Sequence, residues 1–587
     1  MTLTAQHLID GLDDAQRVAA EALLGPVCVL AGAGTGKTRA ITHRIAYGVA
    51  TGVYAPNRVM ALTFTSRAAS ELRTRLRGLG ASGVAARTFH ASALSQLNYF
   101  WPIVVGGGLP RVVDGKARLL AQAAERIHLR VDTAALRDVA AEIEWRKVSE
   151  LSIEDYGRML VGAGTGTSPR PTPGSLDAAQ TLDLVRAYEA LKDERRQLDF
   201  EDVLLACAGM IESEPSVAMH VREQYRFFVV DEYQDVSPLQ QRLLDLWLGD
   251  RSDLCVVGDA SQTIYSFAGA SSGFLLDFPR RYPDATTVRL EQNYRSSAPI
   301  VDVANRLMRG RNGALTLHAV PAAGRADPPG PPAPEPATEP TVTGYETDAA
   351  EAAAVARELA ASILQGVSPQ SLAVLYRMNA QAAPLEAALA DAGVAYQVRG
   401  GARFFDRPEV RQAVMSLRAA SLSVADEPLF KSVSDVLRSL GWTLEAPQTA
   451  GSVRERWDSL NAIMGLVDDV PSGTTFREFT DDLLARQAAQ HEPAIAAVTL
   501  CTLHAAKGLE WDDVHIVGLG DGLLPIGYAR TRDAVDEERR LLYVGITRAR
   551  RRLALSWAAS AAGPREPSRF LAELGIHTDH EERASAR

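Results

Sequence analysis

Two adjacent carboxylates, Asp231 and Glu232, are the residues of this chain whose types and spacing best suit a chemical reaction. They directly follow the apolar run Phe227–Val230, which is typical of a buried strand. Hydrolysis of a nucleoside triphosphate needs such a pair, because one carboxylate holds Mg²⁺, usually through water, and the next orients the attacking water. Taken alone, such a pair is more often an acidic turn after a strand than a catalytic site. The rest of the chain favours hydrolysis.

A glycine-rich segment, Ala31–Thr38 (AGAGTGKT), supplies the phosphate site that such a reaction requires. It stands between a strand-like run, Pro26–Leu30, and a helical pattern, Gly36–Thr51, as in a P-loop. Backbone N–H groups of such a loop converge on phosphates at the helix N-terminus. Lys37 would reach the β- and γ-phosphates, and Thr38 would ligate Mg²⁺. The other loop residues predicted to bind the nucleotide are Ala33, Gly34, Thr35 and Gly36.

Two arginines near later α/β boundaries could complete a nucleotide site. Arg295 stands in LEQNYRSS and Arg548 in EERRLLYVGITRAR. If the second α/β domain closes on the first, these side chains could approach the γ-phosphate, where an arginine is worth about 10³–10⁵ in rate. Each arginine taken singly is open to a plainer interpretation, a surface cation. Tyr294 could stack on the nucleotide base or fill a core.

The elements that must position these residues fall into two α/β sets. Residues 26–95 alternate strand and helix, which predicts a parallel sheet. From about residue 98 to 198, and again from about 403 to 492, the patterns are helical. The predicted strands are Pro26–Ala31, Arg58–Phe64, Val84–Thr88, Phe227–Asp231, Asp253–Gly258 and Thr287–Leu290 in the first set, and Ser371–Tyr376, Val394–Val398, Val498–Thr502, Val514–Leu519 and Arg552–Trp557 in the second.

These patterns predict two α/β domains, each with a helical insertion. The predicted boundaries are 1–97 and 199–290 for the first domain, 98–198 for its insertion, 291–389 and 493–575 for the second domain, 390–492 for a short second insertion, and 576–587 for a disordered tail. Gly/Pro-rich composition predicts surface loops at Val161–Ser175 and Leu315–Glu339. The string GAGTGTS at Gly162–Ser168 lacks a lysine and is predicted to be a linker.

Bulk composition narrows the class without deciding the partner. At 587 residues the chain predicts roughly four domains. No run reaches the roughly 18 apolar residues of a membrane span, and the N-terminus lacks the features of a signal peptide. The four cysteines have no CxxC spacing, so buried reduced thiols are expected and neither zinc nor disulfides are implied. We therefore expect a cytoplasmic protein. The net charge of −10 does not exclude nucleic acid, because an acidic protein can carry a basic groove.

The order of the motifs gives a resemblance. With Gln16, Ala31–Thr38, Asp231–Asp235, Tyr294-Arg295 and Thr547-Arg548 in this order, the chain resembles the UvrD/Rep/PcrA group of superfamily 1 DNA helicases from about residue 12 to residue 571. The resemblance implies two RecA-like parallel-sheet P-loop domains, with ATP and Mg²⁺ as cofactors. It is strongest to the smaller UvrD-type subgroup of actinobacteria without its C-terminal accessory domains. That implies a truncated chain or a shorter relative.

The resemblance also implies roles at the nucleotide. Glu232 would be the catalytic base, and Asp231 would hold Mg²⁺ together with Thr38. Gln262 would sense the γ-phosphate and couple it to DNA. Nucleotide contacts and charge stabilisation are implied for Gln16 at the base, Lys37 at the phosphates, Arg39 at a further contact, Arg295 and Arg548 as arginine fingers, and Glu510 at the ribose.

A third set of residues matches motifs that contact DNA in the family. They are Thr63, Phe64, Thr65, Arg67, Thr88, Phe89, His90, Tyr265, Phe267, Thr502, His504 and Lys507. Aromatic residues among hydroxyl and basic groups suit single-stranded DNA, because stacking contributes about 1–3 kcal/mol per base without demanding sequence. For Phe64 and Phe89, core packing is the alternative.

The function implied by the resemblance is ATP-dependent 3′→5′ translocation on single-stranded DNA, with strand separation at single-/double-strand junctions, in repair or replication at the nucleoid. Partner proteins of those pathways are expected but not identified. Phe267-Ala268 stands where the family has Trp-Arg, Ala382-Ala383 where it has Ser-Arg, and the second insertion is short. These departures favour a first alternative, a translocase that displaces proteins and unwinds poorly. A second alternative, an ATP-gated DNA-binding protein with little turnover, conflicts with the intact Lys37 and Glu232.

Overall fold

The computed structural model describes residues 4–162, 172–173, 176–321, 338–399, 405, 407–421, 427–445, 452–467, 470–471, 473–489, 496–559 and 565–576. The chain divides into two compact units, one made of Met1–Gly32 and Gly36–Leu290 and the other of Ala33–Thr35 and Glu291–Arg587. The central parts of both predicted loops lie outside the described residues. So do the GAGTGTS string beyond Gly162 and the predicted tail beyond Ile576.

The first unit contains a six-stranded parallel sheet in the order β3-β2-β6-β7-β1-β8. Its strands are β1 (Val27–Ala31), β2 (Val59–Thr63), β3 (Ala85–Thr88), β6 (Phe227–Val230), β7 (Leu254–Gly258) and β8 (Thr286–Leu290). Strand β7 lies between β1 and β6, and Leu30 pairs with Gly258. The segments that follow these three strands therefore meet at one carboxyl edge, where parallel sheets bind ligands.

Helices cover both faces of this sheet because its strands are apolar on both sides. In β6, Phe228 and Val230 pack in one core, whereas Phe227 and Val229 pack in the other. The first core includes side chains from α5 (Phe89–Val104), α10 (Phe200–Ser213), α11 (Pro215–Gln224) and α12 (Pro238–Leu248), with α13 (Gly273–Leu276) and α14 (Phe278–Arg281) beside them. The second includes side chains from α1 (Ala5–Ile9), α2 (Asp14–Glu21), α3 (Lys37–Ala50) and α4 (Ser66–Gly78).

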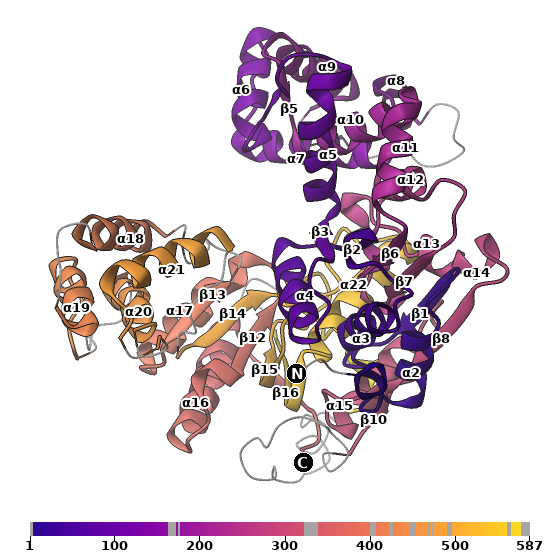
Figure 1. Ribbon diagram of the computed structural model, residues 1–587. Helices are drawn as coiled ribbons and strands as arrows, with labels where there is room; N and C mark the ends of the chain where they lie inside the picture. The colour runs from indigo at the N-terminus through magenta and orange to yellow at the C-terminus, as the bar shows by residue number, and fades with distance from the viewer. Residues whose placement is uncertain are drawn as a thin grey trace. The chain divides into compact units, whose positions relative to one another are not determined.

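A helical cluster stands at one end of the first unit (Figure 1). It consists of α6 (Lys116–Arg126), α7 (Thr133–Val148), α8 (Ile153–Leu160) and α9 (Ala178–Glu194), with the paired short strands β4 (Arg111–Val112) and β5 (Gln197–Leu198). Two buried lysines join it to the sheet domain: Lys147 Nζ lies 2.7 Å and Lys192 Nζ 3.1 Å from Asp199 Oδ2. Because Asp199 caps α10, these ion pairs fix the cluster to a helix of the sheet core.

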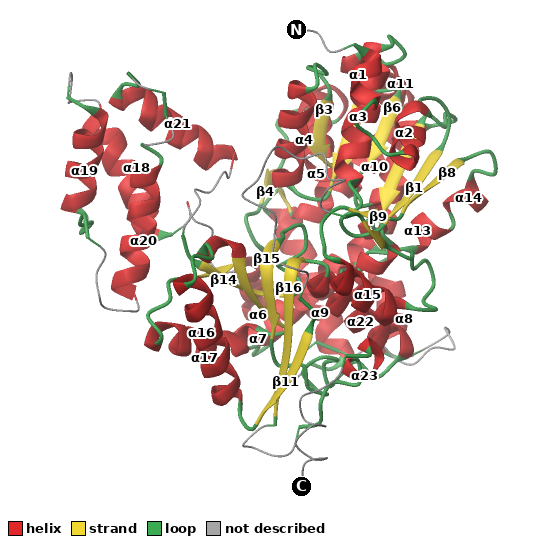
Figure 2. Ribbon diagram, turned by 90° about the horizontal axis from the view of Figure 1, so that it is seen from below, coloured by secondary structure: helices red, strands yellow, loops and turns green. Residues whose placement is uncertain are grey.

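The second unit contains another six-stranded parallel sheet, in the order β11-β16-β15-β12-β14-β13. Its strands are β11 (Thr341–Tyr345), β12 (Leu372–Tyr376), β13 (Tyr396–Arg399), β14 (Val498–Thr502), β15 (Trp511–Ile516) and β16 (Ala549–Ala558). Figure 2 shows α16 (Asp348–Leu364) and α17 (Ala382–Asp391) on one side of these strands, and α15 (Ala298–Met308) and α22 (Arg532–Ile546) on the other. The short strands β9 (Gln292–Asn293) and β10 (His318–Ala319) pair separately, and α23 (Leu571–Leu574) packs on α15.

Four further helices of this unit surround a core of their own. They are α18 (Pro408–Ser421), α19 (Leu429–Ser439), α20 (Ser452–Gly465) and α21 (Phe476–Ala489). The core includes the fully buried Leu417, Leu437, Leu460 and Leu483.

Among the helices that the structure describes, none has the length and apolarity to cross a membrane.

The predicted fold class, α/β with two parallel sheets, is confirmed. Individual elements differ from the prediction. Strand β11 was not expected, because it is an edge strand of which only Val342 is fully buried, so its sequence lacks an apolar run. Helix α5 runs to Val104, past the predicted domain boundary at residue 97, and includes Pro102 in its last turn, where one backbone hydrogen bond is lost. Strand β16 begins at Ala549 rather than Arg552.

Candidate nucleotide and DNA site

The P-loop joins β1 to α3 through two glycines in left-handed conformation. Gly34 has φ 70° and Gly36 has φ 78°, angles that other residues rarely adopt. A Cβ atom at Gly36 would lie 2.7 Å from the Gln16 side-chain nitrogen, so a larger residue there would displace Gln16. Helix α2 places Gln16 through the Asp13 cap, which accepts a hydrogen bond from the Gln16 backbone N–H at 2.8 Å. The predicted base-reading residue therefore lies directly against the loop.

Lys37 begins α3 and points toward the acidic pair. Its Nζ lies 3.9 Å from Glu232 Oε2, and it is buried without a hydrogen-bond partner among the described residues. Burial raises the pKa of the Asp231 carboxyl to about 7, and the neighbouring Glu232 carboxylate adds to the rise. Lys37 Nζ is therefore a cation that makes no hydrogen bond among the described residues. Burial and the repulsion between the two carboxyl groups beside it raise the pKa of Asp231. Both properties fit a nucleotide phosphate and its cation.

A magnesium ion would be held here by few protein groups. Among the described residues, no three His, Cys, Asp or Glu side chains are grouped so that they could hold a metal ion. Thr38, the second residue of α3, and Asp231 are the ligands that the sequence predicts. Mg²⁺ commonly binds through one or two protein ligands, water and substrate phosphates, so this small set fits a cation that arrives with ATP.

Glu232 is positioned by a buried amide that the predicted site did not include. Its backbone is left-handed, with φ 53°, which is uncommon outside glycine and costs about 1 kcal/mol or more. The fully buried Gln234 donates a hydrogen bond from Nε2 to Glu232 Oε2. Its Oε1 accepts from the backbone N–H of Asp259 at 2.9 Å. Asp259 Oδ2 in turn accepts from Gln262 Nε2 at 2.7 Å. One chain of hydrogen bonds therefore connects the predicted base to the predicted γ-phosphate sensor.

These hydrogen bonds form because β7 lies between β1 and β6. Asp259 follows β7, the central strand of the three, and therefore lies beside Gln234, which follows β6. The signal for Gln234 was present in the VDEYQD string, but nothing in the string shows where the amide points. Burial raises the pKa of Asp259, and the nearby Lys37 opposes the rise.

Arg295 and Glu510, predicted to meet the phosphate and the ribose, form an ion pair with each other. Arg295 Nε donates to Glu510 Oε2, and Arg295 Nη1 donates to the Thr547 carbonyl at 3.1 Å. Arg550 also donates to Glu510. Burial alone would raise the pKa of the Glu510 carboxyl, but the Arg295 and Arg550 guanidinium groups outweigh it and lower that pKa to about 2. Glu510 is thus a carboxylate shared by two arginines.

Arg548 is buried just after the end of α22 and bonds to nearby backbone carbonyls. It is 2% exposed, and its guanidinium donates to the Val544 carbonyl at 2.8 Å and the Leu509 carbonyl at 3.2 Å. Arg39 donates to the Gly11 carbonyl at 2.8 Å. In this structure both guanidinium groups bond to backbone oxygens.

The tip of the P-loop is held by a residue that the predicted site omitted, Asn293. Its Nδ2 donates to the Ala33 carbonyl at 2.7 Å, while its Oδ1 accepts from the backbone N–H groups of Arg295 and Ser296. The Tyr294 N–H donates to the Gly34 carbonyl at 2.8 Å. The string LEQNYRSS carried the signal, but the prediction drew only Tyr294 and Arg295 from it.

Three of the predicted DNA-contacting aromatics form a row in which the two end rings are exposed and the middle ring, Tyr265, is partly buried. The Phe64 ring stacks on Tyr265 at 5.6 Å between centroids, and Tyr265 meets Phe267 edge-on at 6.1 Å. Phe64 and Phe267 are 41% and 62% exposed. Phe89 differs: it is 3% exposed and stacks on Trp247 in the core, which is the packing alternative that the sequence left open.

The remaining predicted DNA contacts occupy strand ends and helix starts. Thr65 caps α4 and Thr88 caps α5, and each accepts a backbone N–H at 3.1 Å. Burial, with smaller contributions from nearby cations, lowers the pKa values of His90 and His504 to about 4, so both are neutral at pH 7. The others are Thr63 at the end of β2, the exposed Arg67, Thr502 at the end of β14, and Lys507.

A P-loop and an acidic pair at the carboxyl edge of a parallel sheet define a P-loop nucleotide hydrolase, here with a second α/β unit. The sequence matches the UvrD/REP helicase N-terminal domain over residues 12–283 and the UvrD-like helicase C-terminal domain over residues 288–444 and 427–560. The chain therefore belongs to the UvrD/REP helicase family.

Named relatives agree with this assignment. The chain is similar to the ATP-dependent DNA helicase UvrD2 of Mycobacterium tuberculosis, with 48% identity over 600 residues that cover 98% of this chain and 83% of the relative. It is 30% identical to DNA helicase II of Escherichia coli, over 97% of this chain and 88% of that one. Identity to the ATP-dependent DNA helicase PcrA of Leuconostoc citreum is 29%, over 97% and 86% of the two chains.

Proposed function

We propose that this protein is an ATP-dependent DNA helicase that moves 3′→5′ on single-stranded DNA and separates strands at duplex junctions. The observation that carries the proposal is the approach of Lys37 Nζ to within 3.9 Å of Glu232, which brings the P-loop and the acidic pair into one site. The names of the relatives support DNA as the substrate, and the name of UvrD2 supports ATP as the energy source. A role at the nucleoid, in repair or replication, follows from the same relationship.

In the proposed reaction, water attacks the γ-phosphorus of ATP and ADP leaves with the bridging oxygen; Thr38 and Asp231 would hold Mg²⁺, which would offset the charge of the phosphates. Lys37 and the loop N–H groups bind the phosphates, and Gln16 reads the base. Glu232 accepts the proton of the attacking water, and Gln234 holds its carboxylate in place. Arg295 and Arg548 would stabilise the developing negative charge, for which they must exchange their present partners for phosphate.

The link to DNA would run from Gln262 to the aromatic row. Gln262 closes a short 3₁₀ turn, Ala260–Gln262, and Tyr265 and Phe267 follow within five residues. A change at the γ-phosphate that moves Gln262 would therefore move the rings on which bases stack. Because every base has a π-face, stacking on these rings needs no particular sequence, which suits a protein that translocates along DNA.

The decisive experiment measures the ATPase rate against oligothymidylate length, beside unwinding of duplexes with a 3′ or a 5′ single-stranded tail. We expect DNA-stimulated hydrolysis and unwinding of the 3′-tailed duplex alone. Unwinding of only the 5′-tailed duplex would refute the polarity. An ATPase that is no faster with DNA, and no faster than Glu232→Gln, would instead establish an ATP-gated binding protein.

A translocase that displaces proteins but unwinds poorly is the second candidate. Phe267 is 62% exposed, but Ala268 follows it where the family resemblance implies an arginine, so this DNA contact would have stacking without the adjacent charge. Streptavidin displacement from a biotinylated strand, measured beside duplex unwinding, separates the two. Fast displacement with slow unwinding would favour the translocase.

A further inference from the structure

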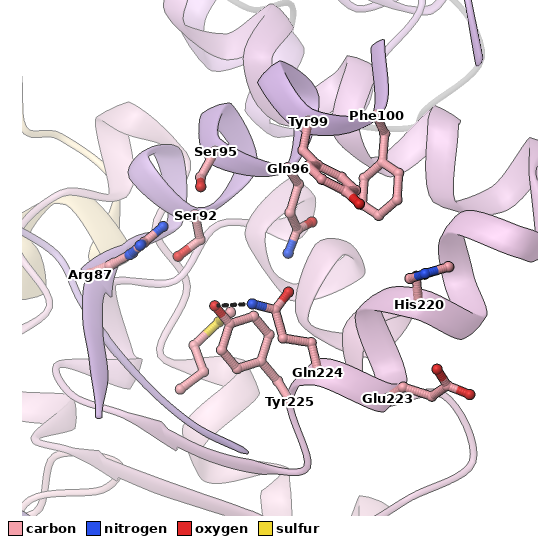
Figure 3. Close-up of a pocket in the computed structure, with 11 residues that line it drawn as sticks. Arg87, Ser92, Ser95, Gln96, Tyr99, Phe100, His220, Glu223, Gln224 and Tyr225 are labelled. Atoms are coloured by element: carbon pink, nitrogen blue, oxygen red, sulfur yellow. Dashed lines mark hydrogen bonds between the residues drawn. The ribbon is translucent and has the colours of Figure 1, made fainter. Parts of the chain in front are cut away.

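A cavity of about 510 Å³ lies on one face of the first sheet, away from the P-loop. Side chains from β2, β3, α5 and α11 line it (Figure 3). Tyr225, on its floor, stands just before β6, whereas Asp231 follows the other end of that strand. The cavity therefore lies beneath α5 and α11 rather than at the carboxyl edge that carries the predicted nucleotide residues. Its volume is within the usual range for small-molecule sites, about 300–1,000 Å³.

A glutamine aims an unused donor into this cavity. Gln96 Oε1 accepts hydrogen bonds from Trp247 Nε1 at 2.9 Å and from Cys207 Sγ at 3.3 Å. These two donors fix the orientation of the amide, because only its oxygen can accept. The amide nitrogen consequently faces the cavity (Figure 3), and it is buried without a hydrogen-bond partner among the described residues. Gln96 is only 8% exposed.

Other donors converge on the same space. Ser92, 2% exposed, has a hydroxyl that is likewise buried and without a partner in the described part of the chain. The Tyr225 hydroxyl accepts from Gln224 Nε2 at 3.2 Å, which leaves its own hydrogen for donation. Arg87 extends toward Ser92 in Figure 3. Each buried donor left without an acceptor costs about 1–3 kcal/mol, so the cavity favours a ligand that accepts several hydrogen bonds.

The charged and aromatic side chains of the cavity narrow the chemical class of the ligand further. Arg87 brings a positive charge, while the carboxylate of Glu223 points away from the converging donors (Figure 3). The rings of Tyr99 and Phe100, which meet edge-on at 4.8 Å, stand on the opposite side from Arg87. A guanidinium matches the two coplanar oxygens of a carboxylate, and aromatic walls favour an apolar body attached to it.

We propose that this cavity binds a carboxylate carried on an aromatic or apolar group. The carboxylate accepts from Gln96, Ser92 and Arg87, and the apolar group lies against Tyr99 and Phe100. Such a carboxylate can come from a small organic acid or from the C-terminus of a partner protein that ends in an aromatic residue. The site is independent of the proposed helicase activity, since none of these side chains has a role in it.

The test uses the full chain and calorimetric titration with two probes, 3-phenylpropanoate and the peptide acetyl-Gly-Gly-Phe with a free C-terminus. Their carboxamide counterparts are the matched controls. We expect the acids to bind with a Kd of about 1 mM or tighter and the amides about tenfold more weakly. Binding by the peptide alone would identify a protein C-terminus as the source, and binding by 3-phenylpropanoate alone would identify a small acid.

Variants locate the binding. Arg87→Gln and Gln96→Leu should each weaken the acids about tenfold, while Arg77→Gln, an exposed arginine on α4 outside the cavity, should not. Arg87→Gln keeps the test valid if loss of the Trp247 partner prevents Gln96→Leu from folding. Three results would overturn the proposal. They are equal affinity for the acids and their amides, displacement of each acid by inorganic phosphate at a concentration equal to that of the acid, and no binding of either acid. Weaker binding of oligothymidylate by Arg87→Gln would reassign the cavity to DNA.

Discussion

Substitution of Gln234 tests whether the buried amide positions the catalytic base. In Gln234→Glu, the donor that bonds Glu232 Oε2 is replaced by a carboxylate, while the side chain keeps its length. A hydrogen bond to a charged group contributes about 1.5–3 kcal/mol, and each 1.36 kcal/mol is tenfold in rate, so its loss predicts a kcat about 10- to 100-fold lower. The added negative charge, beside Glu232 and 3.3 Å from Asp235 Oδ2, makes the upper end the expected one.

The assay is steady-state ATPase at saturating oligothymidylate, with ATP affinity measured separately by a fluorescent analogue. Affinity should change little, because Lys37 and the loop glycines are untouched. Gln234→Met, which removes the donor without adding charge, should lose about tenfold. A matched control is Gln241→Met, another buried glutamine, whose amide bonds Tyr233 and Asp245 instead of the acidic pair. A kcat within twofold of wild type in Gln234→Glu would refute the positioning role.

Three further outcomes follow from the same geometry. Glu232→Gln should still bind ATP but lose at least about 10³ in kcat, and DNA-stimulated turnover in this variant would remove the base assignment. Phe267→Ala should weaken oligothymidylate binding by about 1–3 kcal/mol, whereas Phe89→Ala should lower the unfolding free energy by about 3–5 kcal/mol; the reverse pattern would contradict their placements. Burial, with a smaller contribution from Arg552, lowers the pKa of His515 from 6.5 to about 4, so the folded state binds fewer protons than the unfolded state between these values. Stability should therefore fall by about 2 kcal/mol between pH 7 and pH 5 through this residue, and His515→Gln should remove that share of the pH dependence in denaturant titrations.

The sequence by itself determined the two α/β sets and the phosphate loop. Both depend on local patterns: apolar runs of strand length, a glycine-rich turn, and a helix start that carries Lys37 and Thr38. The acidic pair was equally local, because it directly follows β6. An edge strand such as β11 escaped prediction, since only Val342 of its residues is fully buried and the residues form no apolar run.

Tertiary structure decided which side chains meet. The order of strands β6, β7 and β1 places Gln234 against Asp259, residues 25 apart in the chain, and no local pattern encodes that neighbour. The same holds for Glu510, for which the family resemblance implies a ribose contact and which the fold pairs with Arg295. Phe64 and Phe89 belong to similar Thr-Phe strings, yet one ring is exposed and the other is buried on Trp247. Local chemistry identified the candidates, but only long-range packing set their partners and exposure, because those depend on strand order rather than on spacing along the chain.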